Sequence, residues 1–161
     1  MRHNRKIIYL AGFLFSIPVA LTSYINSSFL GNYINEYYIG VIYILSALLA
    51  IIGMLKMPKI LTLLGNRVAT LWSSALFFFS LILLSFADRN SIILPAFVLY
   101  FVSSTFIVDT LDIFIEDFSE NSKIGGIRGI YLSIVSLSWV VAQIISGSII
   151  NKSSLRGVYL L

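Results

Sequence analysis

The stretch that decides the fold is Y38-I-G-V-I-Y-I-L-S-A-L-L-A-I-I-G-M-L55, in which no side chain is charged. A helix crosses about 30 Å of bilayer hydrocarbon with roughly 20 apolar residues, and this stretch is close to that length. Polar and apolar side chains do not alternate along it, as they would in a strand of a membrane β-barrel. The stretch therefore predicts a transmembrane helix.

Similar apolar runs flank this stretch, one before it and three after it. The predicted helices cover residues 7–28, 38–55, 68–87, 91–116 and 130–150. Pro18 interrupts the first run, and Pro95 lies in the first turns of the fourth. We expect an all-α, polytopic membrane protein whose five transmembrane helices, with short connections, form a single domain over residues 1–161.

The composition favours insertion into a membrane. Hydrophobic residues make up 58% of the 161 residues and charged residues 11%, whereas soluble domains average about 25% charged residues. The chain has no cysteine, which excludes disulfides and thiolate metal sites. Its formal charge of +4 is typical of a membrane protein whose basic loops lie beside anionic lipid. We expect the lipid bilayer as a partner, and no nucleic acid.

Basic residues are divided unequally between the two sides that five crossings would create. Eight lie on the side of the N-terminus and three on the other side. The eight are Arg2, Arg5, Lys6, Lys56, Lys59, Arg67, Lys123 and Arg128, and the three are Arg89, Lys152 and Arg156. Because Lys and Arg favour cytoplasmic loops, we expect a multi-pass protein of the plasma (cytoplasmic) membrane with a cytoplasmic N-terminus.

Five carboxylates crowd the end of the fourth predicted helix, in I107-V-D-T-L-D-I-F-I-E-D-F-S-E120. At about 100° per residue, four of them share an arc of about 80°: Asp109, Asp112, Glu116 and Glu120. Asp109 falls a turn or two inside the hydrocarbon, where a charge must face the bundle or a wet cavity. Asp109 and Asp112 are therefore candidates for a solute or proton pathway, with a structural hydrogen bond as the alternative for Asp109.

Polar residues also gather on one face of the fifth predicted helix. An arc of about 100° holds Ser136, Trp139, Gln143, Ser146 and Gly147. Small and hydroxyl residues on such a face are typical of close helix packing, but an amide near mid-bilayer needs a protein partner, water or solute. Gln143 and Trp139 are further pathway candidates, as is Asn26 in the outer part of the first helix, for which an interfacial position is the alternative.

Three short motifs resemble those of the major facilitator superfamily of transporters. The stretch P58-K-I-L-T-L-L-G-N-R67 is similar to the basic connection between helices two and three, with Gly65 and Arg67 at family positions. The stretch I124-G-G-I-R-G-I-Y131, which contains Arg128 and Gly129, resembles the entry to helix five. A142-Q-I-I-S-G147 resembles the glycine-rich stretch that antiporters of the family carry in that helix.

The resemblance implies the N-terminal half of a secondary active transporter that moves a small solute by alternating access. Such transporters combine two six-helix halves, so we expect a sixth helix and a C-terminal half to lie outside this chain. The implied partners are the solute, a coupling proton or ion, and either a second transporter half or further copies of the chain. Enzymatic activity, a metal and a cofactor are not expected.

Two other functions fit parts of the sequence. One is a non-transporting membrane protein of the same ancestry, either accessory or degenerate. The other is suggested by the spacing D-x-x-D-x-x-x-E of Asp109, Asp112 and Glu116, which resembles the magnesium-binding motif of UbiA-type membrane prenyltransferases. The asparagine that usually precedes the first aspartate of that motif is absent, as is its second acidic cluster.

Overall fold

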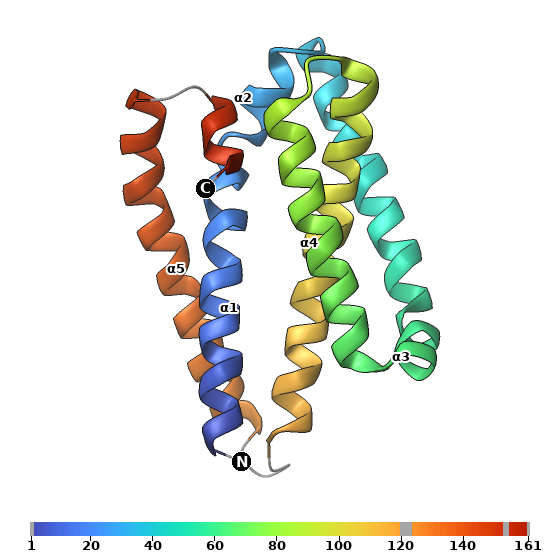
Figure 1. Cartoon of the computed structure of the whole chain (residues 1–161), viewed down its shortest axis with the longest axis vertical. Coiled ribbons are helices and arrows are strands. Elements are labelled where there is room, and N and C mark those ends of the chain that lie inside the picture. The colour runs from blue at the N-terminus through green and yellow to red at the C-terminus, as the bar shows by residue number, and fades with distance from the viewer. Residues whose placement is uncertain (1, 120–123, 153–154, 161) are drawn as a thin grey trace.

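The computed structural model describes residues 2–119, 124–152 and 155–160, and every regular element in these ranges is a helix (Figure 1). The elements are α1 (Arg2–Ser23), α2 (Asn26–Gly31), α3 (Glu36–Phe86), α4 (Asn90–Asp117), α5 (Ile124–Lys152) and the 3-10 helix η2 (Leu155–Leu160). Four of them, α1, α3, α4 and α5, are long and apolar enough to cross a membrane. The predicted all-α class is confirmed for the described residues.

The helix α3 contains two of the predicted spans. As one straight helix its 51 residues would extend about 75 Å, more than twice the thickness of bilayer hydrocarbon. Gly65 interrupts it with φ +77° and ψ 157°, a conformation that glycine adopts without the steric cost of a side chain. Figure 1 shows α3 turning near its label and running back, so the parts before and after Gly65 run in opposite directions.

The part of α3 before Gly65 is longer than the sequence predicts. We expected a helix over 38–55 followed by a connection, yet the helix continues through Pro58 to the Gly65 break. Residues 61–64 are rich in leucine, a good helix former, and the Thr62 hydroxyl donates to the Lys59 carbonyl at 2.9 Å. The motif over 58–67 therefore lies mostly on a helix.

The first predicted helix, 7–28, is divided in two. α1 ends at Ser23 and α2 begins at Asn26. Pro18 removes one backbone donor, and the Thr22 and Ser23 hydroxyls donate to the Pro18 and Val19 carbonyls at 2.8 and 2.6 Å. Hydroxyl bonds of this kind bend a helix slightly, but α4 continues through the same bonds of Ser103 and Thr105, so they do not by themselves end α1. α4 differs from the prediction by one residue at each end, and α5 begins six residues before residue 130.

Two helix pairs build the bundle, α1 with α5 and α3 with α4 (Figure 1). A Cβ atom at Gly12 of α1 would overlap the ring of Tyr131 on α5. In the same way, a Cβ at Gly53 of α3 would overlap the ring of Phe106 on α4. Each glycine therefore lets an aromatic side chain of the neighbouring helix lie directly against its backbone, a close approach that membrane helices use for packing.

Aromatic contacts join the two pairs in the middle of the bundle. The ring centroid of Phe77 on α3 lies 4.9 Å from that of Phe15 on α1 and 5.4 Å from that of Tyr100 on α4. Phe77 has no exposed surface. On the outside, large apolar side chains such as Leu63 and Ile144 are 82% and 72% exposed. Exposed apolar surface on this scale is expected of helices that face lipid.

The connections gather at two ends of the bundle (Figure 1). The start of α1, the Gly65 break, the end of α4 and the start of α5 lie toward one end, which we call the N-terminal end. α2, the start of α3, the turn between α3 and α4, and η2 lie at the other, which we call the opposite end. Arg67 and Arg128 thus lie toward the N-terminal end and Arg156 toward the opposite end, while Lys123 lies outside the described residues.

We expect Gly12→Leu to lower the melting temperature of the purified protein in detergent, because the new side chain must displace the buried Tyr131 ring. Overpacking a well-packed core costs about 1–3 kcal/mol. Gly40→Leu is the matched control, since no atom lies within 4 Å of a Cβ at that position. Equal melting temperatures of Gly12→Leu and Gly40→Leu would contradict the close contact of α1 with α5.

Candidate functional site

A polar patch on the bundle surface brings together two of the predicted pathway residues. Gln143 on α5 donates a hydrogen bond from Nε2 to the Tyr24 hydroxyl at 2.6 Å. The ring of Trp139, one turn earlier on α5, meets the Tyr24 ring edge-on with centroids 6.3 Å apart. Gln143 and Tyr24 are both exposed, and Trp139 is half-buried. We call these three residues the Tyr24 patch.

The Tyr24 patch lies beside an open face of α5. One side of this helix is buried and includes Ile127, Tyr131, Ser138 and Ala142. The exposed side is wider and includes large apolar residues such as Leu137 and Ile144. Within it, the open face is an arc of about 80° that holds mostly small and polar residues. It consists of Gly125, Gly129, Ser133, Ser136, Val140, Gln143 and Gly147. A Cβ at Gly129 or at Gly147 would meet no atom within 4 Å, so no described residue packs against this face at these two positions.

Asp109 lies on α4 and is partly exposed. At 100° per residue it points about 160° away from Leu111, which is buried against the rest of the bundle. Among the described residues, none pairs with or hydrogen-bonds to its carboxylate. The structural hydrogen bond weighed as an alternative for Asp109 is therefore not present in the described part of the chain.

Asp112, the second acidic candidate, has a partner. Its carboxylate forms an ion pair with the guanidinium of Arg128 on α5. The two side chains are 32% and 49% exposed, so the pair contributes about 0–1 kcal/mol. It joins the end of α4 to the start of α5, and connects a predicted pathway residue with a predicted motif residue. Gly129, next to Arg128, lies on the open face of α5.

The carboxylates of α4 do not converge on a common point. In the described ranges, no three His, Asp or Glu side chains lie close enough to hold a metal ion. Asp109, Asp112 and Glu116 follow one another along the helix, and Asp112 is engaged with Arg128. Their arrangement therefore offers no ligand cluster of the kind that the prenyltransferase spacing suggests.

The Gly65 break is tied to α4 by a residue that sequence reasoning missed. Asn66 donates from Nδ2 to the Thr110 carbonyl at 3.1 Å, while its own Oδ1 is buried without a partner among the described residues. Arg67, the next residue, has an exposed side chain. Gly65 thus acts as the turn between two parts of α3, and Arg67 lies at the start of the second part.

Asn26 lies inside the opposite end of the bundle. It is 4% exposed, and its Oδ1 accepts a hydrogen bond from the Tyr159 hydroxyl of η2 at 2.7 Å. Burial raises the pKa of Tyr159, so this hydroxyl stays protonated and can donate. A second buried pair, Thr22 and Tyr100, has its hydroxyl oxygens 2.6 Å apart. Asn26 thus holds η2 in place, and its role in a pathway stays a prediction.

Arg156 fastens η2 to two connections at the opposite end. Its Nε donates to the Tyr33 hydroxyl at 2.8 Å, and its guanidinium lies 2.6 Å from the Asp88 carboxylate. The Asp88 hydrogen bond, and then the Tyr33 one, raise the pKa of Arg156 and keep it charged. From the sequence, Arg156 was identified only as one of three basic residues on the side opposite the N-terminus, and these contacts were not predicted.

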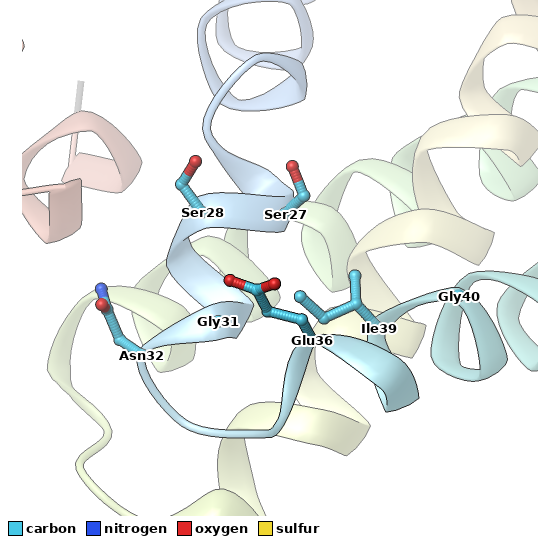
Figure 2. Close-up of a pocket in the computed structure, with 7 residues that line it drawn as sticks. All are labelled: Ser27, Ser28, Gly31, Asn32, Glu36, Ile39 and Gly40. Atoms are coloured by element: carbon cyan, nitrogen blue, oxygen red, sulfur yellow. The ribbon is translucent and has the colours of Figure 1, made fainter.

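An open hollow of about 600 Å³ also lies at the opposite end, between α2 and the start of α3 (Figure 2). Figure 2 shows the Glu36 carboxylate lying below α2, with the Ser27 and Ser28 hydroxyls pointing away from it. Glu36 occupies the first turn of α3, where a negative charge favours the helix, and Asn35 caps that helix by accepting from Tyr37 N at 3.0 Å. Its position at the start of α3 gives Glu36 a structural role, and no predicted site residue lines the hollow.

Comparisons with known proteins identify no relative. No family model matches the chain, and neither a curated protein nor a solved structure matches it. The resemblance to the major facilitator superfamily therefore stays an expectation based on short motifs, and a function has to be argued from the geometry of the chain itself.

We expect Tyr159→Phe to lower the melting temperature in detergent, because it leaves the buried Asn26 oxygen without its donor. A buried polar group that loses its partner costs about 1–3 kcal/mol. Tyr37→Phe removes a hydroxyl from a side chain that is 81% exposed, and should leave the melting temperature unchanged. A Tyr159→Phe protein as stable as Tyr37→Phe would contradict the buried hydrogen bond.

Proposed function

We propose that this chain is one half of a secondary transporter that moves a small solute across the cytoplasmic membrane by alternating access. The Tyr24 patch is the observation that carries the proposal. Gln143 lies on the apolar span Ile124–Ile149, six residues from its end, and its exposed side chain donates to the hydroxyl of exposed Tyr24, which directly follows the span of α1. An amide that faced hydrocarbon would leave donors and acceptors unpaired at a cost of several kcal/mol.

A second bundle that covers the open face of α5 would remove this cost. The small residues at Gly129, Ser133 and Gly147 allow another helix to approach closely. Gln143 and Tyr24 would then border a water-filled path between two bundles, which is where transporters built from two halves bind their solutes. The covering bundle is either a different half or a second copy of the chain.

Asp109 is the residue suited to coupling with a proton or another cation. It is a partly exposed carboxylate within an apolar span and has no partner in the described part of the chain. Carboxylates inside membrane spans are costly and mark ion and proton routes. Asp112 is less suited, because Arg128 already neutralises it.

The distribution of basic residues supports an orientation with the N-terminal end of the bundle in the cytoplasm. Arg67 and Arg128 lie at that end, while Arg156, at the opposite end, pairs with Asp88. A basic residue neutralised by a carboxylate contributes less to positive charge on its side. The short motifs that resemble the major facilitator superfamily agree with this orientation.

The absence of cysteine from the sequence makes the water path directly testable with single-cysteine variants. In membranes of cells that express the protein, we expect Gln143→Cys to react with a charged, membrane-impermeant thiol reagent. Ile144→Cys is the matched control, because Ile144 has nearly the same depth and is 72% exposed on the side expected to face lipid. A thiol reacts through its thiolate, which hydrocarbon disfavours, so this variant should stay unlabelled.

The labelling pattern decides between the alternatives. Reaction of Gln143→Cys alone, slowed by a solute that the cell transports, would support a solute path beside α5. If neither cysteine reacted, the patch would lie in lipid or in a dry interface, and the proposal would be wrong. Equal reaction of both would show that this part of α5 does not lie in hydrocarbon.

A further inference from the structure

A groove opens between α1 and the part of α3 that follows Gly65, with α4 as its floor. Its outer section is a hollow of about 380 Å³ whose lining includes Ile7, Arg67 and Thr70. A second hollow of about 280 Å³ continues it deeper into the bundle. Ala11, Thr70 and Leu111 line both hollows, so the two form one continuous groove.

The groove carries a positive charge at its mouth. The Arg67 side chain is exposed there, and no carboxylate in the described ranges pairs with it. Lys6, also exposed, directly precedes Ile7 on the facing wall. The part of α3 after Gly65 begins beside Arg67, so the positive end of its helix dipole adds to the charge. Asp109 and Glu116 point to the other side of α4, about 140–160° from the groove residue Leu111. Asp117 directly precedes the lining residue Phe118 and offsets one of the two positive side chains, so Arg67 and Lys6 leave a net positive charge at the mouth.

The deeper part of the groove is apolar. Leu14, Phe15, Phe78 and Ile107 line it, and the Thr70 hydroxyl already donates to the Asn66 carbonyl at 2.8 Å. Leu14 and Phe78 are 55% and 54% exposed, so the groove opens sideways toward the surrounding lipid. Aliphatic chains fit such a surface, whereas a polar solute would find few partners there.

The length of the groove corresponds to one leaflet of the bilayer. Arg67 and Phe78 are separated by eleven positions on α3. At 1.5 Å per residue that distance is roughly 16 Å, about half of the 30 Å hydrocarbon thickness. A phosphate held at Arg67 would therefore lie at headgroup level while a chain extended along the groove to the middle of the membrane.

We propose that this groove is a binding site for an anionic phospholipid of the leaflet at the N-terminal end. The phosphate pairs with the Arg67 guanidinium, and one acyl chain lies along α1 and α3 as far as Phe15 and Phe78. The charge at the mouth, the apolar walls, the sideways opening and the one-leaflet length all match this occupant. The site is on a different face from the Tyr24 patch and does not depend on solute transport.

Native mass spectrometry of the detergent-purified protein tests this site, with added dioleoyl phosphatidylglycerol or dioleoyl phosphatidylcholine as probes. We expect one phosphatidylglycerol to be retained in preference to phosphatidylcholine. Arg67→Gln should weaken that preference about five-fold, the usual effect of one cation beside anionic lipid. Lys59→Gln is the matched control, because Lys59 is exposed near the same end but does not line the groove.

A second variant tests the acyl-chain part of the site. Ala11→Phe should fill the groove and lower retention of both lipids, with the helical circular dichroism signal unchanged. Equal retention of the two lipids by the wild type would overturn the proposal, because the anionic headgroup would then not be recognised. Equal losses in Arg67→Gln and Lys59→Gln would overturn it in favour of diffuse charge at this end of the bundle. A dimer that carries no lipid and dissociates in Ala11→Phe would overturn it too, because a second copy would then fill the groove.

Discussion

In bilayer hydrocarbon no water is available to a polar group, and this constraint would apply to the four helices that are long and apolar enough to cross a membrane. A helix satisfies most of its backbone donors and acceptors internally. Most side-chain hydroxyls that form hydrogen bonds among the described residues also bond within their own helix. The Ser46 hydroxyl donates to the Ile42 carbonyl at 2.8 Å, and that of Ser103 to the Leu99 carbonyl at 2.6 Å. Such residues are polar in the sequence but need nothing from a neighbouring helix. A side chain that cannot be satisfied in this way stands out as a site of function or of tertiary contact.

The polar groups that break this rule fall into two kinds. At the ends of the bundle they pair with each other: Asp112 with Arg128 at the N-terminal end, and Asn26 with Tyr159 at the opposite end. These pairs connect helices that the apolar core alone would hold less specifically. Along the spans, Gln143 reaches only as far as Tyr24, and Asp109 has no partner among the described residues. For polar groups of the second kind we propose contact with water, solute or another bundle.

The helices themselves were largely predictable, because an uncharged apolar run of about 20 residues is typical of a membrane-spanning helix. The run over 38–55 lies within α3, and 91–116 lies within α4. The connection after Leu55 was not predictable from proline content, since Pro58 is tolerated inside the helix and the chain turns only at Gly65. The end of α1 at Ser23 was missed as well, because hydropathy does not record a break inside an apolar run.

The candidate site was predictable one helix at a time. Helical spacing placed Trp139 and Gln143 on one face, and the structure adds Tyr24, which lies 119 positions away from Gln143. The bond between Asn26 and Tyr159 spans 133 positions and involves a short 3-10 helix, so no periodic pattern announces it. Contacts between residues so far apart in the sequence depend on how the helix pairs pack against each other. Glycines such as Gly12 allow close packing, but the sequence alone does not show which helix packs there.

The most direct test is to find on which side of the membrane each end of the bundle lies. This orientation decides where the proposed water path, the proposed lipid site and the basic residues would lie. Reporter fusions after Tyr33, Gly65 and Ser119 measure it. We expect the first to report the outside and the other two the cytoplasm, in agreement with five crossings and a turn at Gly65. A Gly65 fusion on the same side as the Tyr33 fusion would contradict the double crossing of α3, and a reversed pattern at all three positions would contradict the orientation.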